Sequence, residues 1–440
     1  MMDVERGGTL TLRLSGEHFA AATLFLLAGA VGLVWVAPDL AVGDYLAPRV
    51  AAVTHIFTLG WLTLTIFGAL SQLLPVALGA PIFSPRLGHA AFWSFAAGIP
   101  IFTAGLAMER MPMLAAGGTL VGVGVLLAVA NVAATLARGH TRDVTWSAIA
   151  GGISYLAVAL VLGLVLARNL DTEFIAGSRV RVLAAHLHIA VVGWAMLVIV
   201  GVANRLLPMF LLSHGADTRW SRRAFVCLAA GVPVFAVGML VPWRIAAWAG
   251  AALLEAGLGA FLWQAYVFYR VRVRKRLDIG MRFARASLGF FVAAGALGPV
   301  LLALGGAHAR LGAAYVVSGF LGGIVLFVTG FLYKIVPLLS WTARFGKRIG
   351  KTALPTAADL YSAAVARVQL VLGVLGVAVM LGGIAAASAP AVRVGTVAYL
   401  ANVLLFVYQL ACVRWRTPPA FRSPPLPAAP RALGARNHAE

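Results

Sequence analysis

Residues 55–75 have the sequence HIFTLGWLTLTIFGALSQLLP, and residues 188–208 have the sequence HIAVVGWAMLVIVGVANRLLP. The histidine, both glycines, the tryptophan and the proline occupy the same places in the two stretches, which lie 133 residues apart. A weaker copy at residues 317–337 keeps both glycines and the proline, with Val317 and Gly323 in place of the histidine and the tryptophan. Repeats of this kind usually indicate structural pseudo-symmetry, so the three stretches are predicted to be equivalent helices.

The composition indicates that the chain lies in a membrane. Of its 440 residues, 61% are apolar and 11% are charged, whereas a soluble protein carries about 25% charged residues. This excludes a soluble enzyme, a disordered chain and a disulfide scaffold. The two cysteines, Cys227 and Cys412, form neither a CxxC motif nor a CxxCH site for covalently attached heme.

Twelve apolar stretches are long enough to cross a membrane as helices, which takes roughly 20 residues each. They are 19–37, 51–77, 89–107, 112–136, 144–167, 182–212, 224–241, 245–269, 286–305, 311–339, 362–388 and 394–412. The repeated sequences lie in the second, sixth and tenth of them. We therefore expect an all-α integral membrane protein with twelve transmembrane helices in a pseudo-three-fold (3 × 4 helix) arrangement. Residues 1–414 are expected to form this domain, and residues 415–440 a Pro-rich disordered cytoplasmic tail.

The positions of Lys and Arg predict the orientation. Twenty-four of them lie on the side that holds both termini and eight lie in the opposite loops. Both termini are therefore expected to be cytoplasmic, in the inner (plasma) membrane of a prokaryote. The net charge of +21 is interpreted as a topology signal and as contact with anionic membrane lipid, most clearly at residues 270–276 (RVRVRKR). No stretch is typical of a nucleic-acid-binding domain, and no nucleic-acid partner is expected.

Three of the nine histidines, His55, His186 and His188, lie inside long apolar helices, where ionisable side chains are costly and tend to mark sites. The alternative is a histidine that hydrogen-bonds a neighbouring helix. Neutral imidazole is a strong ligand of heme iron, and His55 and His188, at equal depth on equivalent helices, suit the two sides of one low-spin iron. His186 is rotated from His188 by about 200° around the helix, so it is expected to face a different inter-helix space and a second prosthetic group.

The repeated glycines and tryptophans have two interpretations each. The pairs Gly60/Gly68 and Gly193/Gly201 either leave a flat surface for a macrocycle or allow close helix packing. The tryptophans of the repeat, Trp61 and Trp194, either stack on a porphyrin or fill space, and we favour space-filling.

These residues resemble a known family, subunit I of the heme–copper oxidases. The stretch that begins His186-Leu187-His188 and continues to Pro208 resembles the family's H-x-H helix, most closely in the C-type branch. Residues 55–87 resemble its second helix and the G-A-P-x(4)-P-R-L string that follows, although the string is one residue shorter here. The resemblance implies twelve helices with pseudo-three-fold symmetry, His55 and His188 as low-spin heme ligands, and His186 as the ligand of a second heme.

The chain also departs from that family. The H-x-H helix is the tenth in the oxidases and the sixth here, and the sequence has no His-His pair for a copper site. The tenth stretch has no histidine, and Tyr315 stands where the repeat aligns with His186. We therefore expect one or two hemes b as cofactors and no copper. A more distant resemblance is to the NnrS-like heme-containing membrane proteins, which are linked to nitric oxide handling.

Several charged residues lie in or at the ends of apolar stretches. Arg205 and Lys334 occupy one repeat position, three residues before each proline, and either reach the lipid headgroups or form an anion or proton-entry site. Glu255 lies in the middle of the eighth stretch and is either protonated, paired with a cation or part of a proton path. Together with Tyr315, these residues form the predicted ion or proton path.

We expect a heme b-binding membrane protein of the heme–copper oxidase superfamily that transfers electrons, binds or reduces a diatomic gas (NO or O₂), or both. Its electron donor is expected to be a quinol or a cytochrome. Two alternatives are a three-repeat secondary transporter that uses Arg205, Lys334 and Glu255, and a non-catalytic assembly factor with an oxidase-like fold. The presence of bound heme distinguishes the first hypothesis from both alternatives.

Overall fold

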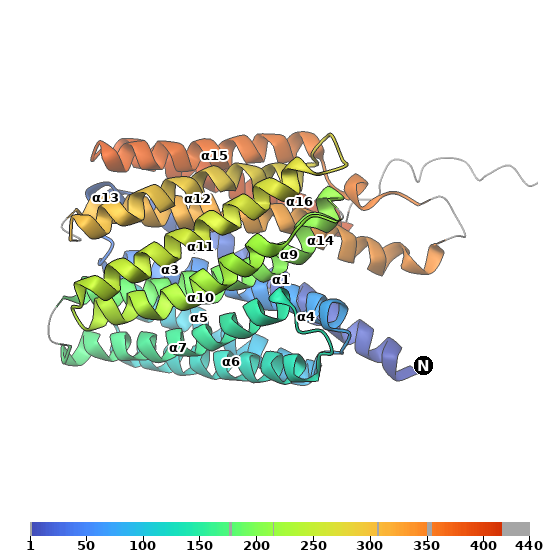
Figure 1. The fold of residues 1–440 in the computed structure, drawn as a ribbon, viewed down its shortest axis with the longest axis horizontal. Coiled ribbons are helices and arrows are strands. Elements are labelled where there is room, and N and C mark those ends of the chain that lie inside the picture. Colours follow the sequence, from blue (N-terminus) through green and yellow to red (C-terminus); the bar gives the residue numbers. More distant parts are fainter. Residues whose placement is uncertain (1, 176–177, 214, 306–307, 350–353, 416–440) are drawn as a thin grey trace, which may run out of the picture.

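The computed structural model describes residues 2–175, 178–213, 215–305, 308–349 and 354–415. Twelve helices within these ranges are long and apolar enough to cross a membrane, which confirms the expected all-α membrane architecture. In Figure 1 the long helices run along the longest axis of the molecule. Residues 416–440 of the predicted tail lie outside the described residues.

The chain forms three successive units of four long helices, and the second helix of each unit is composite. The first unit consists of α1 (Met2–Trp35), the composite helix of α3 (Pro48–His55), η1 (Ile56–Thr63) and α4 (Leu64–Leu78), α5 (Pro85–Ala107) and α6 (Met111–Arg138). The second consists of α7 (Val144–Thr172), the composite helix of α8 (Arg179–Leu187), η2 (His188–Met196) and α9 (Leu197–Leu211), α10 (Arg219–Leu240) and α11 (Arg244–Arg270). The third consists of α12 (Ile279–Ala303), the composite helix of α13 (Ala309–Val316), η3 (Val317–Val325) and α14 (Leu326–Phe345), α15 (Ala363–Ala385) and α16 (Ala389–Trp415).

Short elements complete the chain, and most of the helices are longer than their apolar stretches. The helix α2 (Ala37–Val42) follows α1, and the 3₁₀ turns η4 (Gly346–Arg348) and η5 (Ala357–Leu360) precede α15. The helix α12 begins at Ile279 and not at 286, because Asp278 caps it by accepting a hydrogen bond from the Met281 backbone nitrogen at 3.1 Å. A stretch predicted from hydropathy stops at the first charged residues, whereas a helix with a capping residue can extend through them.

A π-helical segment occurs at the same place in each composite helix. The segment η1 begins one residue after His55, η2 begins at His188, and η3 begins at Val317. π-helical turns are rare in helices and frequent at functional sites. Their coincidence with the repeat shows that the three composite helices are structurally equivalent, including the copy that lacks the histidine.

The repeated glycines serve close helix packing. A Cβ atom at Gly60 would lie 2.5 Å from the Phe25 ring, and one at Gly193 would lie 2.8 Å from the Tyr155 ring. In the third unit, a Cβ atom at Gly322 would lie 2.4 Å from the Phe290 ring. Each composite helix therefore receives an aromatic ring from the first helix of its own unit at a position where only glycine fits.

The repeated tryptophans fill the space between units. Both Trp61 and Trp194 are buried, with 1% and 2% of their surface exposed. The indole nitrogen of Trp194 donates a hydrogen bond to Thr63 Oγ1 of the first unit at 3.2 Å, and its ring packs on Phe67. This agrees with the space-filling interpretation.

A second three-fold feature joins the last two helices of each unit. The Asn131 side chain accepts from the Ser84 backbone nitrogen and donates to its carbonyl, both at 3.0 Å. The Gln409 side chain does the same for Ser362, at 3.2 and 2.6 Å. The Gln264 side chain accepts from the Ser221 nitrogen and donates to the carbonyl of Asp217. In each unit a buried amide of the fourth helix therefore bonds backbone groups at or just before the start of the third.

Candidate functional site

The two repeated histidines have the same local geometry. The Nδ1 atom of His55 lies 2.7 Å from the carbonyl oxygen of Ala51, and that of His188 lies 2.8 Å from the carbonyl oxygen of Ala184. Because a carbonyl oxygen can only accept, Nδ1 must carry the proton in both rings. In the neutral imidazole, Nε2 then holds the free lone pair, which is the arrangement in which histidines bind metals.

His188 faces the third unit. Its Nε2 atom lies 3.1 Å from the hydroxyl oxygen of Tyr315 on α13, and the two rings stack with centroids 6.0 Å apart. Since Nε2 has only its lone pair to offer, the Tyr315 hydroxyl is the donor. The ring of Phe235 on α10 closes the other side, with centroids 4.4 Å apart.

His186 packs against α7 of its own unit. The Nδ1 atom of His186 is buried and has no hydrogen-bond partner within the described part of the chain. Gly163 on α7 provides the room for this ring, because a Cβ atom there would lie 3.1 Å from Cε1 of His186.

The structure therefore brings the three histidines into two neighbourhoods. His186 and His188 face different inter-helix spaces, as the 200° rotation predicts. The contacts place His186 against Gly163 and place His188 against Tyr315. The expected ligand pair of His55 and His188 on one iron stays a prediction.

Glu255 approaches the His188 neighbourhood from the second unit. A Cβ atom at Gly295 of α12 would lie 2.9 Å from Oε2 of Glu255. A Cβ atom at Gly298 would lie 3.4 Å from both Oε1 of Glu255 and Cε2 of Tyr315. The carboxyl group and the phenol ring therefore border the same glycine. Glu255, Tyr315 and His188 thus form a line of neighbouring residues, of which only Tyr315 and His188 are hydrogen-bonded.

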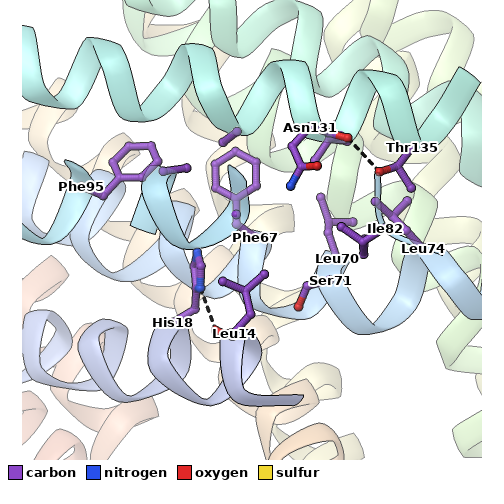
Figure 2. A pocket seen from close by; sticks show the side chains of 14 residues that line it. Leu14, His18, Phe67, Leu70, Ser71, Leu74, Ile82, Phe95, Asn131 and Thr135 are labelled. Carbon is purple, nitrogen blue, oxygen red and sulfur yellow. Dashed lines mark hydrogen bonds between the residues drawn. The ribbon is translucent and has the colours of Figure 1, made fainter. Parts of the chain in front are cut away.

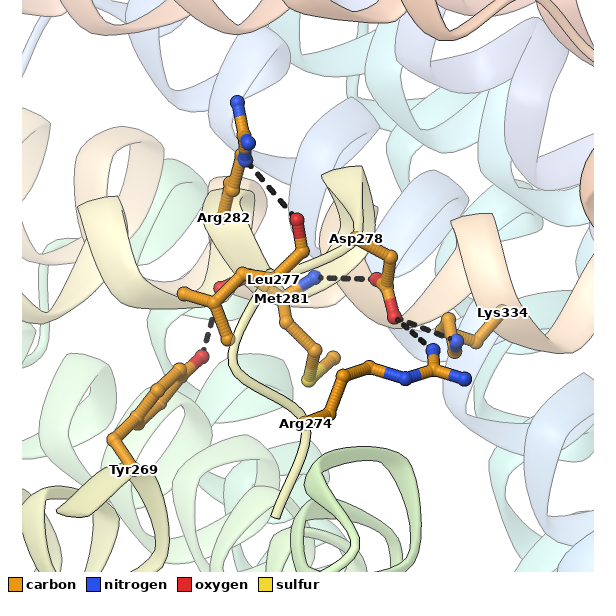
Figure 3. Close-up of polar contacts among 7 residues, drawn as sticks. All are labelled: Tyr269, Arg274, Leu277, Asp278, Met281, Arg282 and Lys334. Carbon is orange, nitrogen blue, oxygen red and sulfur yellow. Dashed lines mark hydrogen bonds and ion pairs between the residues drawn. The ribbon is translucent and has the colours of Figure 1, made fainter. Parts of the chain in front are cut away.

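Arg205 and Lys334 lie away from this line. Arg205 is exposed, which agrees with a side chain that reaches lipid headgroups. Lys334 Nζ forms an ion pair with Asp278 at 2.8 Å, and Arg274 approaches the same carboxylate (Figure 3). Lys334 follows Tyr315 by 19 residues on one composite helix, which separates them by about 28 Å. The predicted path residues therefore do not meet at one site.

The sequence analysis did not predict the residues that contact Lys334, His186 and Glu255. Asp278 is the single acidic residue among the charged residues of 270–285, and this could have predicted an ion pair. The glycines at positions 163, 295 and 298 carried no signal, because 48 glycines occur in the chain. Only their contacts show that they make room for His186 and Glu255.

A small cavity in the first unit contains another buried histidine. The cavity has a volume of about 30 Å³ and is lined by His18, Phe67, Ser71 and Asn131 among others (Figure 2). His18 is 3% exposed, and its Nδ1 atom bonds the carbonyl of Leu14 at 2.8 Å. His18 lies inside α1, and its burial and its hydrogen bond to the helix backbone indicate a structural role.

Within the described residues, no three or more His, Cys, Asp or Glu side chains lie together in a way that could hold a metal ion. Comparison with known proteins gives one family. The sequence model of the cytochrome c and quinol oxidase polypeptide I family matches residues 18–252, which include all three candidate histidines. Glu255 and Tyr315 lie beyond the matched segment. No curated protein matches the chain.

Proposed function

The chain belongs to the cytochrome c and quinol oxidase polypeptide I family, and on this premise we propose that it binds heme b through His55, His186 and His188. The observation that carries the proposal is the shared geometry of His55 and His188. In both residues the Nδ1–H group donates a hydrogen bond to a backbone carbonyl, so Nε2 is unprotonated and its lone pair can bind a metal. Backbone-anchored imidazoles of this kind are the usual ligands of heme iron.

The surroundings of the histidines fit a heme. The orphaned Nδ1 atom of His186 is a buried polar group without a partner in the described chain, and such groups are rare unless a ligand or ion completes them. Aromatic rings of Phe102 and Phe235 pack on His55 and His188, with ring centroids 5.3 and 4.4 Å apart. A bound heme would supply one-electron redox chemistry and an iron that can bind O₂ or NO. No residue set is proposed for copper.

The line of Glu255, Tyr315 and His188 supports a proton function beside the histidines. The Tyr315 hydroxyl holds its proton toward Nε2 of His188, and Glu255 lies across Gly298 from the same ring. A carboxyl and a phenol in series inside a membrane are typical of proton relays. Iron on Nε2 of His188 would take the lone pair to which the Tyr315 hydroxyl donates, so we propose that Glu255 and Tyr315 supply or remove a proton beside the heme and not through His188.

The electron donor, the orientation and the location are also proposals. A quinol or a cytochrome fits a one-electron acceptor in a membrane, and the distribution of Lys and Arg favours cytoplasmic termini in a prokaryotic inner membrane. The transporter alternative loses support because Arg205 is exposed and Lys334 pairs with Asp278. The assembly-factor alternative differs from the proposal in one property, the absence of heme.

The decisive experiment is a reduced-minus-oxidised absorption spectrum of the purified chain, with a pyridine hemochrome assay. It is repeated on His55→Ala, His186→Ala and His188→Ala, with His140→Ala, an exposed loop histidine, as the matched control. We expect a b-type spectrum in the native chain and in the control His140→Ala. The spectrum should be lost in His55→Ala and in the variant that removes the second ligand of the same iron. The variant that loses CO reactivity but keeps the low-spin spectrum identifies the second site. Absence of heme after expression with heme supplied would overturn the proposal.

A further inference from the structure

Three aromatic side chains form a cluster at the end of the bundle where α10 begins and α11 ends, two helices that lie side by side (Figure 1). The rings of Trp220 on α10 and Trp263 on α11 have centroids 6.2 Å apart, and those of Trp263 and Tyr266 are 5.4 Å apart. Trp263 is 51% exposed and Tyr266 is 48% exposed, so the cluster faces outward from the bundle. In a membrane protein, outward-facing Trp and Tyr side chains are typical of the level of the lipid headgroups.

Two exposed arginines border this aromatic cluster. The guanidinium carbon of Arg223 lies 4.3 Å from the centre of the Trp220 ring. Arg270 follows Tyr266 by four residues and Trp263 by seven on α11, and positions with this spacing lie on one face of a helix. Both arginines are exposed. The cluster therefore has a cation from each of its two helices.

The charge around the cluster is strongly positive. Residues 217–223 contain three Arg and one Asp, and residues 270–285 contain seven Lys or Arg and one Asp. Both carboxylates are already engaged in ion pairs, one with Arg219 at 3.0 Å and the other with Lys334 at 2.8 Å. In the described part of the chain, the two arginines that border the cluster take no part in these ion pairs. The face therefore suits an anion that comes from outside the chain.

An anionic phospholipid fits this face by both shape and charge. Its phosphate can accept hydrogen bonds from guanidinium groups, and its acyl chains can pack on outward-facing aromatic rings. The basic segment between α11 and α12 indicates contact with anionic lipid in general. We propose that the headgroup of one anionic phospholipid binds specifically to the face formed by Trp220, Arg223, Trp263, Tyr266 and Arg270. This inference does not depend on heme.

The test is native mass spectrometry of the full chain in detergent. The chain is titrated separately with phosphatidylglycerol, which is anionic, and with phosphatidylcholine of the same acyl chains, which is zwitterionic. We expect tighter binding of phosphatidylglycerol. The double variant Arg223→Gln/Arg270→Gln is expected to weaken binding of phosphatidylglycerol about thirtyfold, because each cation at a membrane surface contributes a factor of about five. Binding of phosphatidylcholine should stay unchanged.

The matched control removes two other exposed arginines from the same end of the bundle. Arg138 and Arg142 each lie over one aromatic ring, of Phe83 and Trp146 respectively, and these rings are outside the cluster. Because charges outside the site contribute only screened attraction, Arg138→Gln/Arg142→Gln is expected to change binding of phosphatidylglycerol by less than about twofold. The variant Trp263→Leu keeps every charge and is also expected to weaken binding, since it removes the central ring of the cluster.

Four results would overturn the inference. Equal affinity of the native chain for the two lipids would mean that no anionic headgroup is recognised, and this comparison requires no variant to fold. Equal weakening in the control variant would mean that the lipid responds to net charge alone. Full binding in Trp263→Leu would remove the aromatic cluster from the site. A dimer in the mass spectrum that dissociates in Trp263→Leu would mean that a second copy of the chain covers this face.

Discussion

The hydroxyl oxygen of Tyr315 lies 3.1 Å from Nε2 of His188, the nitrogen that an iron would bind. The two residues come from different units, on α13 and at the start of η2, and are 127 positions apart. One lone pair cannot accept a hydrogen bond and coordinate iron at the same time. Tyr315 and heme therefore compete for His188, and this competition can be measured.

Removing the Tyr315 hydroxyl should strengthen heme binding at His188. A neutral hydrogen bond contributes about 0.5–1.5 kcal/mol, so Tyr315→Phe is expected to tighten binding by about two- to tenfold. The measurement is a titration of heme-free protein, followed by the heme absorbance. Tyr155→Phe is the control, because that hydroxyl bonds a backbone carbonyl of α10. Weaker binding in Tyr315→Phe would mean that the tyrosine supports the heme.

A side chain at Gly163 should displace His186. Its Cβ atom would lie 3.1 Å from the imidazole, and overpacking of this kind costs about 1–3 kcal/mol, or tenfold and more in affinity. We expect Gly163→Val and His186→Ala to have the same defect, which is a loss of either CO reactivity or heme content. Gly259→Val is the control, since a Cβ atom there meets no neighbour. Normal spectra and CO binding in Gly163→Val would show that His186 is not a ligand.

Separating Glu255 from Tyr315 should slow proton uptake. Gly298→Leu places a side chain between the carboxyl group and the phenol ring, and Glu255→Gln removes the titratable group. Both variants are expected to keep the oxidised spectrum and to take up fewer protons on reduction, measured with a pH-indicator dye in unbuffered solution. Gly289→Leu on the same helix points into open space and serves as the control. Native proton uptake in both variants would remove Glu255 from the path.

The ion pair of Lys334 should matter little for heme. Lys334 and Asp278 are 21% and 20% exposed, and Arg274 stays beside Asp278 when Lys334 is removed, so Lys334→Met is expected to lower the free energy of unfolding by only about 1 kcal/mol. The heme spectrum should stay unchanged, because Lys334 lies about 28 Å from Tyr315 along the helix axis. Loss of heme or of proton uptake in Lys334→Met would restore Lys334 as a site residue.

The amide caps should carry part of the stability of each unit. Gln409→Leu leaves the backbone nitrogen of Ser362 without a partner, at a cost of about 1–3 kcal/mol, whereas the Ser362 carbonyl still accepts from the Ala366 backbone nitrogen. Thermal unfolding in nanodiscs is expected to show a lower midpoint than for the control Leu404→Ala, an exposed position on the same helix. Equal midpoints would mean that water replaces the amide.

The sequence alone predicts much of the fold, because two of its signals are local. The apolar stretches need only their own composition to show that twelve helices cross the membrane. The repeat from His55 to Pro75 needs only spacing to show that three helices are equivalent, and the π-helical segments confirm it. The equal spacing of the glycines and tryptophans does not tell what these residues do. For the glycines, the contacts with Phe25 and Tyr155 show that they serve helix packing.

The candidate histidines were determined by the sequence, since ionisable residues inside apolar helices stand out by composition and position. Their neighbours were decided only by the tertiary structure. The neighbour of His188 is Tyr315 and that of His186 is Gly163, because the helices meet at angles that no local pattern records. The same holds for Glu255 and Tyr315 beside Gly298 and for Asp278 beside Lys334. Hydropathy and spacing report which residues enter the membrane and at what depth, whereas side-chain partners depend on how the helices rotate and pack against each other.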